Sequence, residues 1–163
     1  MKKIKQLEIP YTELETRTDL SPEDEKLLSL AEAARSRSYS PYSGFSVGAS
    51  VLLDNGEVFT GSNQENSSFP AGICAERAAI FAARSAYPDV PLKTVCITAS
   101  GSIYVKENPV TPCGICRQVF SEYEHEQKQP FRIILASEKG KLLIYDSAEY
   151  LLPFSFYSDH LND

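Results

Sequence analysis

Residues 74–77 read Cys-Ala-Glu-Arg and residues 112–118 read Pro-Cys-Gly-Ile-Cys-Arg-Gln, and the rest of the chain is organised around these two stretches. Together they hold three cysteines, Cys74, Cys113 and Cys116. A closed structural zinc site takes four protein ligands, whereas a catalytic zinc site takes three and leaves one position open. Glu76 is too close to Cys74 to be a comfortable fourth ligand, but it is well placed to face that open position. The pattern predicts a metal that activates water.

Two other interpretations of the cysteines are weaker. Four cysteines allow two disulfides, but a C-x-x-C pair in an intracellular enzyme more often binds metal or takes part in catalysis. A structural zinc site needs a fourth ligand, for which Cys96, His125 and His160 remain. Cys96 lies within an apolar stretch and is expected in the core. We expect His125 at a solvated helix end and His160 in the tail, and neither receives a role.

The overall composition is typical of one soluble globular domain. The chain has 163 residues, 42% of them hydrophobic and 23% charged. No apolar run approaches the ~20 residues of a membrane span, and the first eight residues lack the apolar segment of a signal peptide, so we expect a cytoplasmic protein. The net charge of −6, with scattered Lys and Arg, argues against nucleic-acid binding, which usually needs a basic surface. A small-molecule substrate is therefore expected.

Hydrophobic periodicity predicts the order of helices and strands. Residues 1–20 are expected to form an N-terminal extension, either as an edge strand or as an arm over a neighbour, and residues 21–163 the catalytic domain. Ser21 before Pro22 is typical of a helix start. The apolar residues of that possible edge strand are Ile4, Leu7, Ile9 and Tyr11. The predicted helices are 21–37, 74–86, 113–125 and a short one around 147–151, and the predicted strands are 45–53, 57–62, 94–100, 131–136 and 141–145. This order predicts an α/β fold with three layers, α/β/α, around a mixed five-stranded sheet.

The two cysteine stretches also match a known signature. Zinc deaminases carry H-x-E followed by P-C-x-x-C, and here Cys74 stands in place of the His, which a three-cysteine site allows. With Arg77, the run Asn-Gln-Glu-Asn at 63–66 and Leu-Leu-Pro-Phe-Ser-Phe at 151–156, the chain resembles the small cytidine deaminases of the homotetrameric, three-cysteine type. The resemblance runs from about residue 39 to residue 156. It implies a cytidine deaminase-like fold, one Zn²⁺ per subunit, and a homotetramer with shared active sites.

The resemblance also implies roles for the residues around the metal. The three cysteines would bind Zn²⁺, and Glu76 would be the catalytic residue that moves protons between water and the pyrimidine ring. Three thiolates and Zn²⁺ carry a net negative charge that weakens the metal as a Lewis acid. Arg77, and more weakly Gln118, would lie behind the sulfurs and adjust the metal centre.

For the substrate, the resemblance implies a nucleoside held from several sides. Asn63 and Glu65 would bind the ribose hydroxyls, and Phe45 would stack near the base. The backbone of Ala75 would meet the pyrimidine edge, and Phe156 would enter the active site of a neighbouring subunit. The implied reaction is the hydrolytic deamination of cytidine and deoxycytidine to uridine and deoxyuridine, as in pyrimidine salvage.

Two alternative functions remain open at this point. The first is a deaminase of the same fold that acts on another aminopyrimidine nucleoside or on a nucleoside antibiotic. The second is a non-catalytic, zinc-stabilised binding module. The run at 63–66 favours a substrate with a ribose, and the presence of Glu76 favours an enzyme.

Overall fold

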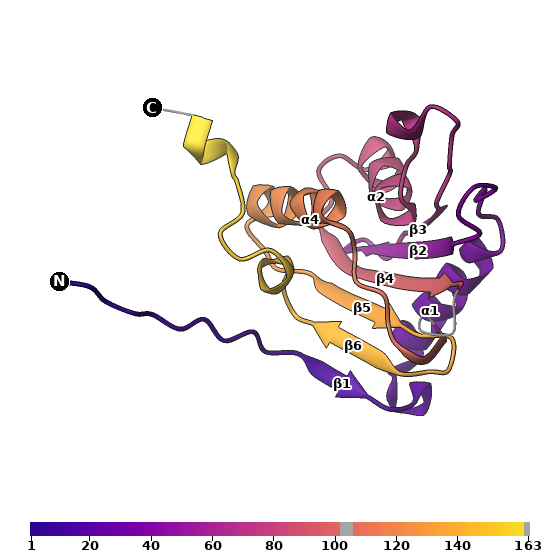
Figure 1. Ribbon diagram of the computed structural model, residues 1–163, viewed down its shortest axis with the longest axis horizontal. Helices are drawn as coiled ribbons and strands as arrows, with labels where there is room; N and C mark the ends of the chain where they lie inside the picture. Colours follow the sequence, from indigo (N-terminus) through magenta and orange to yellow (C-terminus); the bar gives the residue numbers. More distant parts are fainter. Residues whose placement is uncertain (102–105, 162–163) are drawn as a thin grey trace.

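Strand pairing builds one mixed sheet in the computed structural model, which describes residues 1–101 and 106–161 (Figure 1). Within those residues its strands are β1 (Thr12–Leu14), β2 (Ser46–Leu53), β3 (Val58–Ser62), β4 (Leu92–Ser100), β5 (Arg132–Ala136) and β6 (Leu142–Tyr145). The order across the sheet is β1-β6-β5-β4-β2-β3. β4 and β5 run parallel and the other neighbours antiparallel. Five strands were predicted; the additional strand is β1, which comes from the N-terminal extension.

Helices cover both faces of the sheet. The structure has α1 (Pro22–Arg35), α2 (Ala75–Ala86) and α4 (Gly114–Gln127). α2 and α4 lie on one face and α1 on the other, which confirms the three-layer α/β/α architecture (Figure 1). The short helix expected around 147–151 is the 3-10 helix η3 (Ala148–Leu151). In the part of the chain that the structure describes, no helix has the length and apolar character needed to cross a membrane.

The first helix begins where the sequence predicts. The Ser21 hydroxyl accepts a hydrogen bond from the backbone N–H of Asp24 at 3.1 Å, and Pro22 occupies the first helical position. Leu27, Leu28 and Ala31 lie on the face of α1 that packs against the sheet, and all three are fully buried.

Alternating strand residues divide the core into two halves. On β4, Val95 and Ile97 pack with α2 and α4, whereas Cys96 between them packs with α1. Cys96 is completely buried, and this burial raises the pKa of its thiol. The sequence therefore placed Cys96 correctly in the core, and it lies on the opposite face from the other three cysteines.

Glycine at two sheet positions lets the helices approach closely. A Cβ atom on Gly61 of β3 would lie 2.5 Å from the carbonyl oxygen of Ala75, and one on Gly48 of β2 would lie 2.0 Å from that of Ala31. These distances are too short for any side chain. The close approach of α2 to β3 places the N-terminus of α2 beside the end of that strand.

The N-terminal extension joins the domain through β1 and Arg17. β1 pairs with β6 along Thr12 to Leu14, which lies later in the chain than the apolar residues expected to form an edge strand. The Arg17 guanidinium bridges Glu25 and Glu32 on α1. The residues before β1 are extended and exposed. The first of them leave the body of the protein (Figure 1), whereas Leu7 and Ile9 line a small cavity with Tyr150.

Candidate metal and active site

The sulfurs of Cys74, Cys113 and Cys116 gather where α2 and α4 begin. Cys74 and Cys113 are the residues that precede the first turn of each helix. The Sγ atoms of Cys74 and Cys113 lie 3.8 Å apart, those of Cys113 and Cys116 lie 3.6 Å apart, and all three lie within 4.8 Å of one another. Sulfurs bound tetrahedrally at about 2.3 Å from a zinc ion are separated by about 3.8 Å. The donor set and its spacing therefore fit Zn²⁺, and none of these thiols is in a disulfide.

Positive groups surround the sulfurs. Two helix N-termini point their partial positive charge toward the cluster. The hydrogen bond with Cys116, together with Arg77, whose Nη2 lies 3.8 Å from Cys74 Sγ, lowers the pKa of the Cys74 thiol to about 5. The same bond between the two cysteines raises the pKa of Cys116. Arg77 lies where it can offset the negative charge of three thiolates around a metal.

Glu76 lies in the first turn of α2 and is almost completely buried, with 5% of its surface exposed. Burial raises the pKa of its carboxyl group, because removal of water disfavours the charged form. The Glu76 side chain lines the same cavity as Cys74 and Cys113. A carboxyl group with a raised pKa beside a metal site can both accept and donate protons near neutral pH.

A cavity of about 650 Å³ opens in front of the sulfurs. Its wall includes most of the side chains that the sequence singled out, namely Phe45, Asn63, Glu65, Cys74, Glu76 and Cys113. It also includes residues that were not predicted, namely Val47, Tyr42, Ser43, Gln64, Asn66, Phe69, Gly72, Ile73, Val110 and Thr111. Residues 39–44 read Tyr-Ser-Pro-Tyr-Ser-Gly, which is typical of a loop, and this was the signal for Tyr42 and Ser43, since loops often carry binding residues. Its contacts across the cavity could not be inferred without the fold.

Asn63 ties the start of β2 to the cavity. Its Oδ1 accepts hydrogen bonds from Ser38 Oγ at 2.6 Å and from the backbone N–H of Val47 at 2.8 Å. Its Nδ2 donates to the carbonyl oxygen of Phe45 at 2.8 Å. Counting the contacts of the described residues, these bonds leave one of the two amide hydrogens for a ligand.

Glu65 is held by the loop that precedes β2. Its Oε2 accepts from the backbone N–H groups of Tyr42 at 2.9 Å and Ser43 at 3.3 Å, and its Oε1 accepts from the Ser43 hydroxyl. The Ser43 hydroxyl, followed by the Tyr42 amide, lowers the pKa of the Glu65 carboxyl group. The carboxylate stays ionised and keeps lone pairs that can accept hydrogen bonds from a ligand.

Cys116 and Arg77 do not line the cavity, and three further predicted residues also lie outside its wall. Ala75 is fully buried as the first residue of α2, behind the cavity. The side-chain amide of Gln118 donates to the carbonyl oxygen of Phe156 at 2.7 Å, so in this subunit it contacts the C-terminal segment. The Phe156 ring is 54% exposed and does not line the cavity of its own chain.

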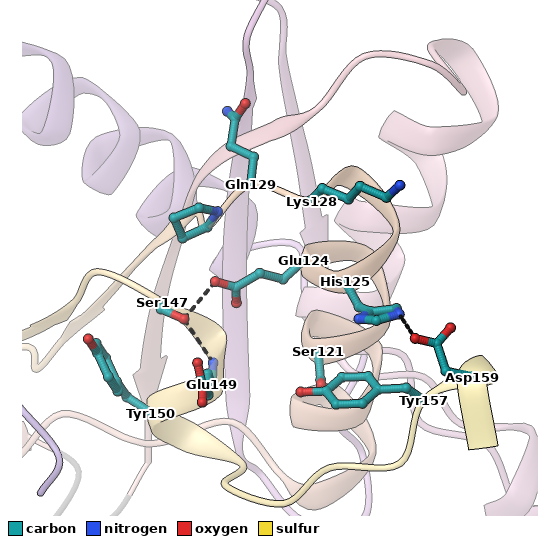
Figure 2. Close-up of a pocket in the computed structure, with 11 residues that line it drawn as sticks. Ser121, Glu124, His125, Lys128, Gln129, Ser147, Glu149, Tyr150, Tyr157 and Asp159 are labelled. Atoms are coloured by element: carbon teal, nitrogen blue, oxygen red, sulfur yellow. Dashed lines mark hydrogen bonds and ion pairs between the residues drawn. The ribbon is translucent and has the colours of Figure 1, made fainter.

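A second cavity, of about 660 Å³, lies beside the C-terminal half of α4 (Figure 2). There Glu124 accepts hydrogen bonds from Ser147 Oγ at 2.6 Å and from the backbone N–H of Ala148 at 2.5 Å. His125 stacks on Tyr157 and lies 3.3 Å from Asp159, so it packs against the C-terminal segment instead of only facing solvent. The His160 side chain is outside the described residues. This second cavity contains none of the three clustered cysteines, so the metal chemistry belongs to the first.

Comparisons with known proteins by sequence and by structure identify the same family. The family model "Cytidine and deoxycytidylate deaminase zinc-binding region" matches residues 21–129. The cytidine deaminase of Sporosarcina psychrophila is 41% identical over 138 residues, which cover 85% of this chain and 94% of that protein. The cytidine deaminase of Halalkalibacterium halodurans is 36% identical over 137 residues, which cover 84% of this chain and 96% of that protein.

Solved structures show the same likeness. The crystal structure of cytidine deaminase from Burkholderia pseudomallei superimposes with a TM-score of 0.71 at 36% identity, covering 81% of this chain and 98% of that one. The structure of cytidine deaminase from Mycobacterium leprae gives a TM-score of 0.62 at 31% identity, covering 82% of this chain and 99% of that one.

Proposed function

Because the chain belongs to the cytidine and deoxycytidylate deaminase family, we propose that its first cavity binds and deaminates pyrimidine nucleosides. The reaction is the zinc-dependent hydrolysis of cytidine and deoxycytidine to uridine and deoxyuridine, with release of ammonia. One observation carries the proposal: of three sulfurs at zinc spacing, those of Cys74 and Cys113 share a cavity wall with the buried carboxyl group of Glu76.

The chain's own residues divide the work of the reaction. Cys74, Cys113 and Cys116 would hold the zinc ion, and Arg77 would offset the charge of their thiolates. When bound, zinc lowers the pKa of water from 15.7 toward ~7 and so supplies a nucleophile at neutral pH. Glu76 would take a proton from the attacking water and deliver it to N3 of the pyrimidine as the water oxygen adds at C4. Glu76 would then take the remaining proton from the C4 hydroxyl group and pass it to the amino group, which leaves as ammonia as the C4–N bond breaks and the C4 carbonyl forms.

Around the nucleoside, the cavity offers a different contact on each side. Phe45 would stack near the base, and the backbone of Ala75 would meet the pyrimidine edge. The free amide hydrogen of Asn63 and the lone pairs of Glu65 would bind the ribose hydroxyls. A site built to hydrogen-bond a hydroxyl rejects analogues that lack it, because a polar group is then left unpaired.

Measurements of metal content and of ammonia release test this function. The purified protein should hold about one zinc per subunit and release ammonia from cytidine and deoxycytidine. Adenosine and free cytosine should be poor substrates, since each lacks part of what the cavity recognises. A zinc-loaded protein that releases no ammonia from any nucleoside would contradict the proposal and favour a binding module.

The ionised Glu65 should also exclude phosphorylated substrates. A phosphate group close to the sugar would meet this carboxylate and be repelled. We therefore expect kcat/KM for cytidine to exceed that for cytidine monophosphate. Similar values for the two substrates would show that Glu65 does not lie beside the sugar.

We further propose a cytoplasmic homotetramer with shared active sites. The exposed Phe156 ring, whose backbone is held by Gln118, supports a role for this residue in the cavity of a neighbouring subunit. Native mass should give four subunits. Mixing Glu76→Gln subunits with Phe156→Ala subunits should restore activity, because some cavities then combine an intact Glu76 with an intact Phe156 from the neighbour. No recovery in a mixed tetramer would place Phe156 outside the shared site.

We also propose that residues 21–163 form the catalytic domain and residues 1–20 an extension that supports it. β1 and the Arg17 bridge to α1 both fasten the extension to the domain edge, far from the sulfurs. A chain lacking residues 1–20 should bind zinc with unchanged stoichiometry but unfold at a lower temperature. Loss of zinc from that truncated chain would mean that the extension is part of the catalytic unit.

A further inference from the structure

Ser43 touches two of the residues that the proposed function assigns to the nucleoside. It lies in the loop between α1 and β2, on the wall of the first cavity. Its hydroxyl donates a hydrogen bond to Glu65 Oε1 and accepts one from the backbone N–H of Phe45 at 3.0 Å. One oxygen atom thus connects the group expected at the sugar with the residue expected at the base.

The loop also holds Glu65 through its backbone. The amides of Tyr42 and Ser43 both donate to Glu65 Oε2, so the two carboxylate oxygens have donors on the same loop. A glutamate side chain has three rotatable bonds, and an exposed one normally samples several rotamers. Donors on both oxygens select one of these orientations before a ligand arrives, which is the general route by which preorganisation improves affinity.

The loop itself is fixed against the strand end that carries Glu65. The backbone N–H of Tyr39 donates to the carbonyl oxygen of Asn63 at 3.0 Å, and that of Glu65 donates to the carbonyl oxygen of Tyr39 at 2.8 Å. Gln64 in turn pairs with Ile73, the residue before Cys74, in both directions at 2.9 Å and 3.0 Å. The position of Ser43 is therefore set by the same framework that positions the first cysteine.

We propose that Ser43 is a positioning residue for nucleoside binding, which sets the Glu65 carboxylate against the sugar and fixes Phe45 beside the base. This inference rests on the proposed function of the cavity. Ser43 acts through Glu65 and Phe45 and is not assigned a contact with the reacting atoms. Its replacement should therefore change mainly KM. Its bond to Glu65 also keeps that carboxylate ionised at lower pH.

Three variants of the full-length zinc-loaded protein test the proposal. Ser43→Ala removes the hydroxyl, and Ser43→Thr keeps it. Ser40→Ala is the matched control from the same loop, because the Ser40 hydroxyl contacts Ser46 and Ser38 at 3.2 Å and 3.3 Å instead of Glu65. For each variant, steady-state kinetics with cytidine and calorimetric binding of uridine give separate readouts of turnover and affinity.

Ser43→Ala should raise KM for cytidine, and Kd for uridine, by about tenfold, the value of one hydrogen bond to a charged group. We expect kcat to change by less than about threefold, and Ser43→Thr to recover most of the loss. With 2′,3′-dideoxycytidine, which lacks the 2′ and 3′ hydroxyls of the sugar, wild type and Ser43→Ala should differ by less than about twofold, since Glu65 then has neither of these hydroxyls to bind. The acid limb of kcat/KM for cytidine should shift to higher pH in Ser43→Ala and stay in place in Ser40→Ala.

Several outcomes would overturn the role of Ser43. These are equal effects of Ser43→Ala and Ser40→Ala, an equal loss with cytidine and with the dideoxy substrate, or a loss confined to kcat. The failure of the proposed function is a separate observation, because it appears as absent ammonia release by the wild type. Should that occur, uridine affinity still decides whether Ser43 positions a ligand in this cavity.

Discussion

At the scale of single residues, Glu76 has an environment unlike that of an ordinary glutamate at a helix start. A glutamate in the first turn of a helix is common, since the helix dipole favours it there. Here the carboxyl group is buried and faces a cavity beside three sulfurs, which raises its pKa. The effect of this environment is therefore on the exchange of protons by Glu76, and not on the stability of the helix.

Replacing Glu76 with glutamine should separate metal binding from turnover. Glutamine has almost the same shape but cannot carry a proton, so kcat for cytidine should fall by about 10²–10⁴-fold, the usual contribution of general acid–base catalysis. Metal analysis should still find about one zinc per subunit, because Glu76 is not one of the clustered sulfur ligands. Near-native turnover by Glu76→Gln would refute the assignment.

A half-buried carboxyl group, that of Glu124, makes stability depend on pH. Burial raises the pKa of its carboxyl group. Hydrogen bonds from Ser147 (Figure 2) and from the backbone of Ala148 act in the opposite direction and lower the pKa by less. Its folded-state pKa therefore lies above the unfolded value, so its favourable contribution is complete below the unfolded pKa and is lost as the pH rises through the folded pKa.

Urea unfolding at several pH values checks this sign. Glutamine is neutral throughout, so the wild type should lose stability relative to Glu124→Gln as the pH rises from about 4 to about 7. Glu122→Gln, an exposed glutamate on the same helix, is the control and should show a nearly constant difference. A constant difference for Glu124→Gln as well would show that its carboxyl group titrates normally.

The sequence could predict those parts of the site that consist of particular residue types at a fixed spacing. Cys74, Glu76 and the C-x-x-C pair are close in the chain to helix starts, so local structure alone brings each of them to the right end of its helix. Ser43 could not be found in that way. Its partner Glu65 is separated from it by β2 and β3, and only the folded sheet brings the two together.

At the scale of elements, the contact between β3 and α2 links the sheet to the metal site. α2 carries Glu76 and begins beside Cys74, and its small residues let it lie directly against Gly61. Any shift of α2 away from the sheet therefore moves a sulfur and the Glu76 carboxyl group together.

Gly61→Ala should produce such a shift. The added Cβ would lie within 2.6 Å of backbone atoms of Ala75 and Ala79, which cannot move independently of the helix. We expect a loss of about 1–3 kcal/mol in the free energy of unfolding, as for other overpacked cores, together with weaker zinc binding. Gly48→Ala is the matched control, since its Cβ meets α1 on the opposite face. It should destabilise the fold while leaving the affinity for zinc less changed, and equal zinc losses in the two variants would contradict the link.

The elements with strong periodicity and the short helix η3 were predicted well, whereas the short strand β1 was not. The three α-helices and β2 to β6 were predicted within a few residues of their observed bounds because each repeats its apolar pattern over several residues. β1 has three residues, and its more apolar neighbours Ile4, Leu7 and Ile9 remain exposed. Its pairing depends on the free edge of β6, which no local pattern in residues 12–14 reveals.

At the scale of the whole molecule, the metal site joins two helices that otherwise have little contact with each other. Cys74 stands at the start of α2, and Cys113 and Cys116 at the start of α4. A bound zinc ion would therefore act as a cross-link on the face of the sheet that carries the cavity.

Zinc removal should accordingly lower both activity and stability. When zinc is present at about 100 times its Kd it adds about 3 kcal/mol, or roughly 5–10 °C in Tm, for a domain of this size. Calorimetry with and without a chelator measures the change, and added zinc should restore turnover. Cys96→Ala is the control, because Cys96 packs against α1 and should leave the zinc stoichiometry unchanged. A Tm that is the same with and without the chelator would rule out the cross-link.

The pairing of β1 with β6 determines the order in which the parts of the sheet can form while the chain is synthesised. β1 leaves the ribosome early but has no hydrogen-bonding partner until nearly all of the chain has followed, since its neighbour in the sheet is β6. Contacts between such distant segments form slowly, whereas both cysteine-bearing helices are synthesised before β6. The edge of the sheet at β6 is therefore the last to be paired, and until β1 joins it, this edge is where the chain is most open to pairing with other chains.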